Sequence, residues 1–316
     1  MNKRTLGSTG LQIAPVVFGG NVFGWTADEA TSFSLLDALV ERGFNTIDTA
    51  NVYSVWVPGH QGGESESILG RWFKRSGKRG EMVLASKVGM QMGDGTKGLS
   101  KENILRSVEA SLTRLQTDYL DLYWSHKDDE ETPLEETLEA YGELLAQGKI
   151  RSIGASNYKG ARVVEALKVA AEKKLPAYAT LQPEYNLFDR QEYETDIAPV
   201  AAETGLYTQP YFSLASGFLT GKYKSIEESK GTKRAARVEK YFTPRGQKIL
   251  DALGQVAAET GAAQASIALA WLMAQPTVAA PIASATKLEQ LDALFEAASL
   301  TLTAAQLDGL TSASAW

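Results

Sequence analysis

The sequence alternates short, apolar, β-rich runs with longer amphipathic stretches, and this alternation limits the possible folds more than any other feature. The runs that resemble strands comprise residues 16–20, 44–48, 82–88, 119–126, 150–156, 179–183, 206–211 and 278–283. A helical pattern follows each run, and strands that alternate with helices form parallel sheets through right-handed crossovers. The sequence therefore predicts an α/β protein with eight βα units.

The organisation of these units favours one domain over two. No Pro/Gly/Ser-rich linker divides the chain, so we expect residues 1–316 to form a single (β/α)8 TIM barrel rather than two Rossmann-like halves. Residues 3–13 resemble an N-terminal β-hairpin. A long charged loop, residues 222–246, separates the seventh and eighth strands, and loops of this length are usually functional or mobile.

Helix boundaries are also marked in the sequence. Thr26 and Glu29 have the spacing of a capping box before a helix at 30–40. Thr132 and Pro133 precede a second predicted helix at 134–146, whose apolar residues share one face, as a helix packed on a barrel requires.

Composition and charge exclude several classes of function. The chain has no Cys and only two His, so disulfides, Cys nucleophiles, Cys-ligated zinc and multi-His metal sites are excluded. A net charge of −6 provides no overall attraction for nucleic acid. No apolar run approaches the roughly 18 residues of a spanning helix, and the N-terminus has no signal-like apolar segment. We therefore expect a cytoplasmic protein with neither a nucleic-acid nor a membrane partner.

Polar residues stand where the predicted strands end, which is where barrel active sites are built. Asp48 ends the second strand, Tyr53 follows in its loop, Lys87 ends the third strand and His126 ends the fourth. A lysine ammonium beside a tyrosine hydroxyl favours the phenolate and lowers the tyrosine pKa. Asp48 can hold Lys87 charged, and His126 can polarise a carbonyl oxygen. This set suits the protonation of an alkoxide as hydride reaches carbon, and it requires no metal.

Each of these residues also has a purely structural interpretation. Asp48 and Lys87 can form a structural ion pair, Tyr53 can pack at the barrel rim, and His126 can be a satisfied core residue. Their joint position at the ends of three adjacent strands favours the functional interpretation.

Segments that follow one another along the chain resemble the aldo-keto reductase family. They are GFNTIDTANVY (43–53), LASK (84–87) with DLYWSH (121–126), GASN (154–157), QPEYNLFDR (182–190) and LASGFLTGKY (214–223). The resemblance extends through essentially the whole chain. It implies an NADP(H)-dependent oxidoreductase that transfers hydride to an aldehyde or ketone, a carbonyl reductase or alcohol dehydrogenase with a small-molecule carbonyl substrate.

The resemblance also assigns residues to roles. Tyr53 becomes the general acid, Asp48 and Lys87 tune it, and His126 positions the carbonyl. Ser156, Asn157 and Gln182 would bind the nicotinamide carboxamide, while Tyr211 would stack on the ring. The cofactor-binding residues expected in the two loops are Phe212, Leu214, Ser216, Gly217 and Lys222 for the pyrophosphate, and Ser284, Thr286, Lys287 and Gln290 for a 2′-phosphate.

The chain departs from the family pattern in both loops. Ala283-Ser284 replaces a common Pro-Gly or Pro-Lys pair, and Gln290 stands where Arg is frequent. Tyr211-Phe212-Ser213-Leu214 replaces the commoner Tyr-Ser-Pro-Leu. Because Ser284, Thr286, Lys287 and Gln290 can still bind a 2′-phosphate, we expect NADP(H) in preference to NAD(H).

Four aromatic residues near strand ends are candidates for the substrate pocket: Phe23, Trp25, Trp56 and Trp124. Core or rim packing is the alternative for each. Two other functions stay open: a non-catalytic nicotinamide-binding regulatory or redox-sensing protein of the same fold, and a barrel lyase or hydrolase. A GxGxxG match at 93–98 lies past the third strand, where it does not indicate a dinucleotide site.

Overall fold

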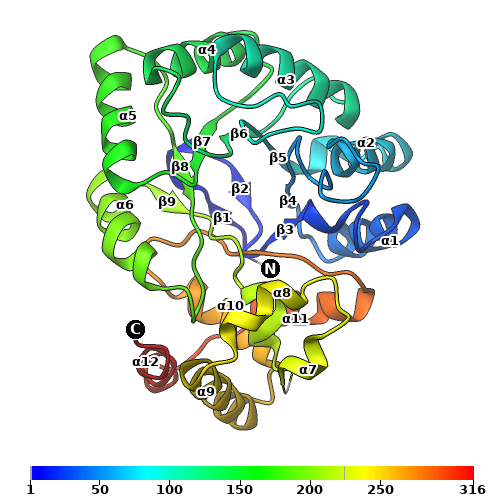
Figure 1. The fold of residues 1–316 in the computed structure, drawn as a ribbon, viewed down its shortest axis with the longest axis vertical. Helices are drawn as coiled ribbons and strands as arrows, with labels where there is room; N and C mark the ends of the chain where they lie inside the picture. The colour runs from blue at the N-terminus through cyan, green and yellow to red at the C-terminus, as the bar shows by residue number, and fades with distance from the viewer. Residues whose placement is uncertain (1, 224) are drawn as a thin grey trace.

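The computed structural model describes residues 2–223 and 225–316, and its centre is one parallel sheet of eight strands (Figure 1). The strand order is β10-β3-β4-β5-β6-β7-β8-β9, so seven strands follow the chain and the last one returns beside the first. Their bounds are β3 Val17–Gly19, β4 Thr46–Asp48, β5 Val83–Val88, β6 Leu122–Ser125, β7 Ile153–Ser156, β8 Thr180–Gln182, β9 Tyr207–Thr208 and β10 Ile282–Ala283. All eight predicted strands are present, each shorter than its apolar run.

The sheet curls until its two edges meet. At one edge Val17 N donates to Pro281 O at 2.9 Å, and Ile282 pairs with Val17. At the other, Thr208 forms a parallel bridge with Val278, and Ile282 N donates to Pro210 O at 2.8 Å. The segment 277–283 thus bonds both β3 and β9, which is consistent with a (β/α)8 barrel.

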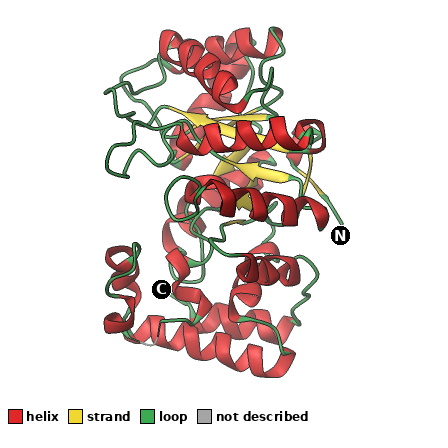
Figure 2. Cartoon of the chain, turned by 90° about the vertical axis from the view of Figure 1, so that its right-hand side faces the viewer, coloured by secondary structure: helices red, strands yellow, loops and turns green. Residues whose placement is uncertain are grey.

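Helices cover the outer face of the curled sheet (Figures 1 and 2). The longer ones are α1 Glu29–Glu41, α2 Glu64–Ser76, α3 Lys101–Leu115, α4 Leu134–Ala146, α5 Gly160–Lys173, α9 Pro244–Thr260, α10 Gln264–Met273 and α12 Ala304–Ala313. The shorter ones are α6 Ala198–Thr204, α7 Ile226–Ser229, α8 Ala235–Val238 and α11 Leu291–Ala297. The predicted helix at 134–146 is confirmed as α4, whereas the cap of α1 is Asp28, which accepts a bond from Thr31 N, rather than Thr26.

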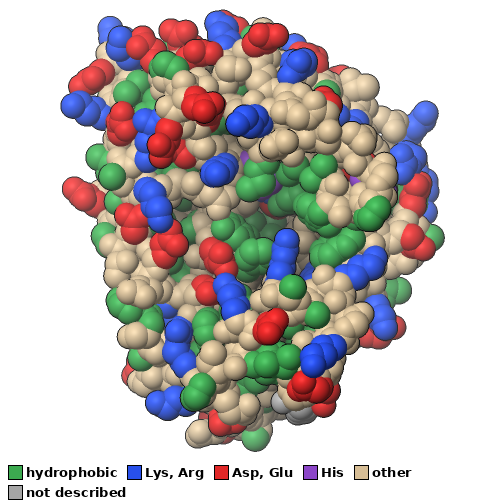
Figure 3. Space-filling view, in the orientation of Figure 1, with side chains coloured by type: hydrophobic (Ala, Val, Ile, Leu, Met, Phe, Trp, Pro, Cys, Tyr) green, Lys and Arg blue, Asp and Glu red, His purple; other side chains and the backbone are tan. Residues whose placement is uncertain are grey.

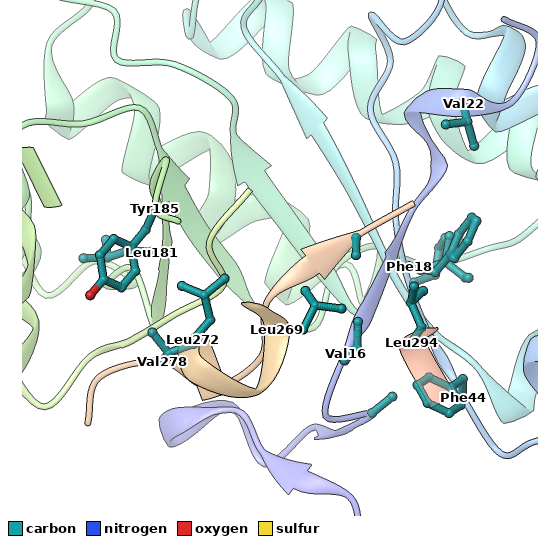
Figure 4. Packing of buried hydrophobic residues seen from close by; sticks show 14 of the residues in the cluster. Val16, Phe18, Val22, Phe44, Leu181, Tyr185, Leu269, Leu272, Val278 and Leu294 are labelled. Atoms are coloured by element: carbon teal, nitrogen blue, oxygen red, sulfur yellow. The ribbon is translucent and has the colours of Figure 1, made fainter. Parts of the chain in front are cut away.

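Strand residues alternate between two apolar clusters, as the pleat requires. Outward residues such as Phe18 and Leu181 join the large cluster between sheet and helices, part of which Figure 4 shows. Inward residues such as Val17 and Leu122 form a smaller cluster inside the barrel. The strands β1 Arg4–Thr5 and β2 Gln12–Ile13 pair antiparallel, and Leu6 and Ile13 beside them belong to this inner cluster. The β1–β2 pair therefore covers the end of the barrel where the strands begin.

The predicted long loop contains short helices. Residues 225–241 include α7, α8 and the 3-10 turn η6 Glu239–Tyr241, and α9 already begins at Pro244. We call residues 225–243 the strap. Among the described residues, no helix is long and apolar enough to cross a membrane.

Candidate active site

The side chains of Asp48, Tyr53 and Lys87 meet at the end of the barrel where the strands end. Lys87 Nζ donates to Asp48 Oδ2, to Tyr53 Oη at 2.8 Å and to Thr49 O at 2.8 Å. Lys87 is 0% and Asp48 2% exposed. Both face inward because their outward neighbours, Ile47 and Ser86, contact the helix layer. The ammonium therefore has all three protons bonded inside the barrel.

A strained turn holds Tyr53 in this position. Ser54, the next residue, has a φ of 75°, which is uncommon for a residue other than glycine. Its buried hydroxyl donates to Phe23 O at 2.7 Å and ties the loop after β4 to the loop after β3. Nothing in the local sequence marked Ser54, because its partner lies 31 residues away.

His126, which directly follows β6, completes the group. The imidazole ring makes an edge contact with the Tyr53 ring at a centroid distance of 5.8 Å. The main-chain N–H of His126 donates to Val88 O. The Nδ1 atom is buried and has no hydrogen-bond partner among the described residues. Burial, reinforced by the Lys87 charge, holds the pKa of His126 well below its usual range, so the imidazole is neutral near pH 7.

The electrostatics correct one expectation. Burial, followed by the Asp48 carboxylate, raises the pKa of Tyr53 well above its usual value of 10, so the predicted net lowering of this pKa is wrong. Burial also lowers the pKa of Lys87, and Asp48 opposes that shift. The physical reason is that both groups lose hydration inside the barrel, which disfavours each charged form. Tyr53 therefore carries its proton throughout the neutral range and can donate it.

A row of polar side chains continues from Asp48 across the barrel. Gln182 Nε2 donates to Asp48 Oδ1 at 3.0 Å, and Ser156 Oγ donates to Gln182 O at 2.9 Å. Asn157 Nδ2 donates to His126 O at 2.8 Å, and Tyr211 Oη donates to Asn157 Oδ1 at 2.6 Å. Asn157 Nδ2 also lies 3.1 Å from Ser156 Oγ, to which it donates, so the four residues predicted to hold the nicotinamide form one hydrogen-bonded network with the Asp48–Lys87 pair.

The predicted pyrophosphate loop has an unusual backbone. Phe212, Ala215, Ser216 and Gly217 have φ of 51°, 47°, 57° and 98°. Left-handed residues outside glycine are strained and gather at ligand sites, where successive N–H groups form anion-binding concavities. A Cβ on Gly217 would lie 3.2 Å from Lys222 Nζ, so this ammonium borders the same turn. Leu214 is half-buried beside it.

The polar side chains of the loop after β10 differ in their bonding and exposure. Ser284 Oγ lies 2.8 Å from both Gly19 O and Asn21 Oδ1, so this hydroxyl ties the loop to the end of β3. Gln290 Oε1 accepts from Thr286 N at 2.7 Å and Thr286 Oγ1 at 3.2 Å. Lys287 is exposed.

The four aromatic candidates separate into two pairs. Phe23 and Trp124 are 0% exposed: Phe23 joins the outer cluster, and Trp124 lies in the inner cluster over Gly154. The packing alternative is correct for these two, since no part of either ring reaches the mouth. Trp25 and Trp56 contact each other edge to face at 5.6 Å, and Trp56 contacts Tyr53 at 6.1 Å. Trp56, which is 42% exposed, therefore borders the Tyr53 ring, and Trp25 packs against Trp56.

The strap contacts the loops that follow β3 and β9, the two strands on either side of β10. Lys233 Nζ donates to Trp25 O at 2.8 Å, and the Arg234 guanidinium lies 5.8 Å from the Trp25 ring centroid. Arg237 lies 5.4 Å from the Phe212 ring centroid. Figure 3 shows a hollow lined by hydrophobic side chains with Lys and Arg side chains at its lower rim, in the region of α8 in Figure 1. The sequence marks this loop as charged but gives no signal for these contacts, whose partners lie far away along the chain.

A separate cavity of about 720 Å³ lies between the start of α1 and the start of α2. Its lining includes Trp25, His60, Glu64 and Arg71, but none of Asp48, Tyr53, Lys87 or His126. Within the part of the chain that the structure describes, no three acidic or histidine side chains are placed to hold a metal.

Comparison with known proteins identifies relatives over nearly the whole chain. The model of the aldo/keto reductase family matches residues 15–315. The uncharacterized oxidoreductase YrpG of Bacillus subtilis is 36% identical over 309 residues, covering 96% of this chain and 92% of the relative. The aldo-keto reductase YhdN of the same organism is 34% identical over 313 residues, covering 96% and 90%. A probable voltage-gated potassium channel subunit beta of rice is 32% identical over 302 residues, covering 92% and 89%.

Proposed function

Since the chain belongs to the aldo/keto reductase family, whose members are oxidoreductases that use nicotinamide cofactors, we propose that it reduces an aldehyde or ketone with Tyr53 as proton donor. The observation that carries the proposal is the bond between Lys87 Nζ and Tyr53 Oη inside a site that also holds Asp48 and a neutral His126. A hydroxyl fixed beside an ammonium is suited to deliver a proton to a developing alkoxide.

The residues present fit a nicotinamide cofactor. The amide and hydroxyl groups of Ser156, Asn157 and Gln182 offer both donors and acceptors to a carboxamide, and Tyr211 lies beside them. The left-handed run at 215–217, with Lys222 against it, suits a pyrophosphate. Lys287 and Thr286 support a 2′-phosphate and hence NADP(H) over NAD(H), with Gln290 bracing their loop. When bound, the cofactor supplies the hydride.

The side chains of the protein supply the proton that the reduced carbonyl oxygen needs. A substrate carbonyl oxygen that accepts bonds from Tyr53 Oη and the His126 imidazole is polarised by both. Tyr53 donates its proton to this oxygen, and the resulting phenolate is stabilised by the Lys87 ammonium, which Asp48 holds in place. Trp25 and Trp56 exclude water from one side and offer an apolar surface to the substrate.

Turnover tests the proposal. Purified protein is mixed with an aromatic aldehyde and NADPH or NADH, and loss of reduced cofactor is followed by absorbance at the nicotinamide band. We expect reduction with NADPH and slower or weaker use of NADH. Absence of quenching of the tryptophan fluorescence by either cofactor contradicts the proposal at its first step.

A regulatory role without turnover is the second candidate, favoured by the similarity to a probable channel subunit beta. The same two measurements separate the two functions. A regulator binds cofactor and quenches fluorescence, but does not reduce an aldehyde at a rate that depends on Tyr53.

A further inference from the structure

Gln209 is the neighbour of Gln182 in the barrel register. Leu181 of β8 pairs with Thr208 of β9, and Gln209 N donates to Leu181 O at 2.8 Å. The next residues on the two strands, Gln182 and Gln209, therefore lie side by side. Thr208 faces outward, because its hydroxyl lies 3.0 Å from Tyr193 Oη in the helix layer. By strand alternation Gln209 therefore faces inward, as Gln182 does.

The two glutamines are equally buried but differently bonded. Each is 2% exposed. Gln182 Nε2 has an acceptor in Asp48 Oδ1, whereas Gln209 Nε2 is buried with no acceptor among the residues that the structure describes. Nearly all buried amides in proteins are bonded, since an unpaired donor loses its bonds to water without replacement. An unpaired amide at this position, where a small ligand is expected, indicates a ligand atom that accepts its hydrogen bond.

The residues around Gln209 indicate which kind of ligand atom accepts its hydrogen bond. Tyr211 N donates to Pro183 O at 2.9 Å, so the β9 ladder continues and Tyr211 shares the inward face with Gln209, two residues away. Tyr211 Oη bonds Asn157 on the far side of Gln182. Gln209 thus lies next to Gln182 of the proposed carboxamide site and on the same face as Tyr211, which is proposed to stack on the ring. A neutral amide donor suits a neutral acceptor, such as a carboxamide oxygen.

We propose that Gln209 is a further cofactor-binding residue, whose Nε2 donates to the carboxamide oxygen of the nicotinamide ring. This inference rests on the proposed function. It adds a residue from β9 to the carboxamide site, and it explains why the chain keeps a long polar side chain in the barrel interior.

The test uses matched substitutions at the two glutamines. Gln209→Met replaces an unpaired amide by an apolar chain of similar shape, so the thermal midpoint of the protein without cofactor should stay equal or rise. Gln182→Met removes the amide that donates to Asp48 Oδ1, so the thermal midpoint of this variant should fall. With NADPH, Gln209→Met should bind about 3- to 10-fold more weakly than wild type by fluorescence quenching, the value of one neutral hydrogen bond. Gln209→Leu provides a second apolar variant should methionine repack the interior.

Three results overturn the inference. One is an unchanged NADPH dissociation constant in both Gln209 variants. Another is a midpoint that falls in Gln209→Met as far as in Gln182→Met, because the amide is then already satisfied in the absence of cofactor. The third is a raised aldehyde KM with unchanged cofactor affinity, which assigns Gln209 to the substrate. Failure of the proposed function itself looks different, since the wild type then either binds neither cofactor or binds one without reducing an aldehyde.

Discussion

Replacing Tyr53 by Phe removes one hydroxyl and leaves the ring. In the structure this hydroxyl bonds Lys87 Nζ, while Lys87 keeps Asp48 and Thr49 O as acceptors. The free energy of unfolding should therefore fall by only about 1 kcal/mol, the net value of one hydrogen bond. The turnover number should fall about 10²- to 10⁴-fold, because the proton donor is gone.

Lys87→Met should give a similar kinetic loss with a much larger loss of stability. The substitution leaves the buried Asp48 carboxylate with Gln182 as its remaining side-chain partner, and an uncompensated buried charge costs about 3–5 kcal/mol. It also raises the Tyr53 pKa further, since the nearby ammonium that favours the phenolate is lost. The two variants thus separate stability from catalysis.

The assay is a double-mutant cycle. Turnover of an aromatic aldehyde and the urea midpoint are measured for both single variants and the double variant, with cofactor binding checked by fluorescence. The kinetic losses should not multiply, because both substitutions disable one proton donor. A double variant slower by the full product shows that Lys87 acts independently of Tyr53. Near-wild-type turnover of Tyr53→Phe refutes the mechanism.

The remaining predictions concern three other positions. The pKa of His126 is lower in the folded protein than its unfolded value of 6.5, so the unfolded chain takes up this proton first as pH falls. The free energy of unfolding should therefore decrease below about pH 6.5, by up to about 1.4 kcal/mol per pH unit. His126→Asn should flatten the profile of thermal midpoint against pH below 6.5, and parallel profiles for variant and wild type would argue against this role of His126. Lys287→Ala should reduce a preference for NADPH over NADH of about 1–3 kcal/mol, measured by titration of both cofactors, whereas equal wild-type affinities contradict the assignment. Gly154→Ala places a Cβ 2.3 Å from Trp124 Cζ3 and should cost about 1–3 kcal/mol in urea unfolding; an unchanged midpoint shows that the ring can move aside.

Much of the architecture follows from patterns that are local in the sequence. The alternation of apolar runs with amphipathic stretches predicted all eight parallel strands and the helix α4. A strand buried on both faces is a short apolar run, and a helix on the sheet has apolar residues at helical spacing, so both patterns can be recognised within a few residues. Strand ends also placed Asp48, Lys87 and His126 at one mouth, because parallel strands all end on the same side.

Other properties depend on partners distant in the sequence. The sign of the Tyr53 pKa shift follows from loss of hydration, which depends on the assembled barrel rather than on the adjacent charge alone. The contact of Lys233 with Trp25 joins residues 208 positions apart, and the unpaired amide of Gln209 becomes visible only when its neighbours are in place. Aromatic residues near strand ends have the same local appearance whether buried or exposed, so only tertiary packing separates Trp25 and Trp56 from Phe23 and Trp124. Desolvation and close packing are sums over the whole structure, whereas strand and helix periodicity can be recognised in a short window of sequence.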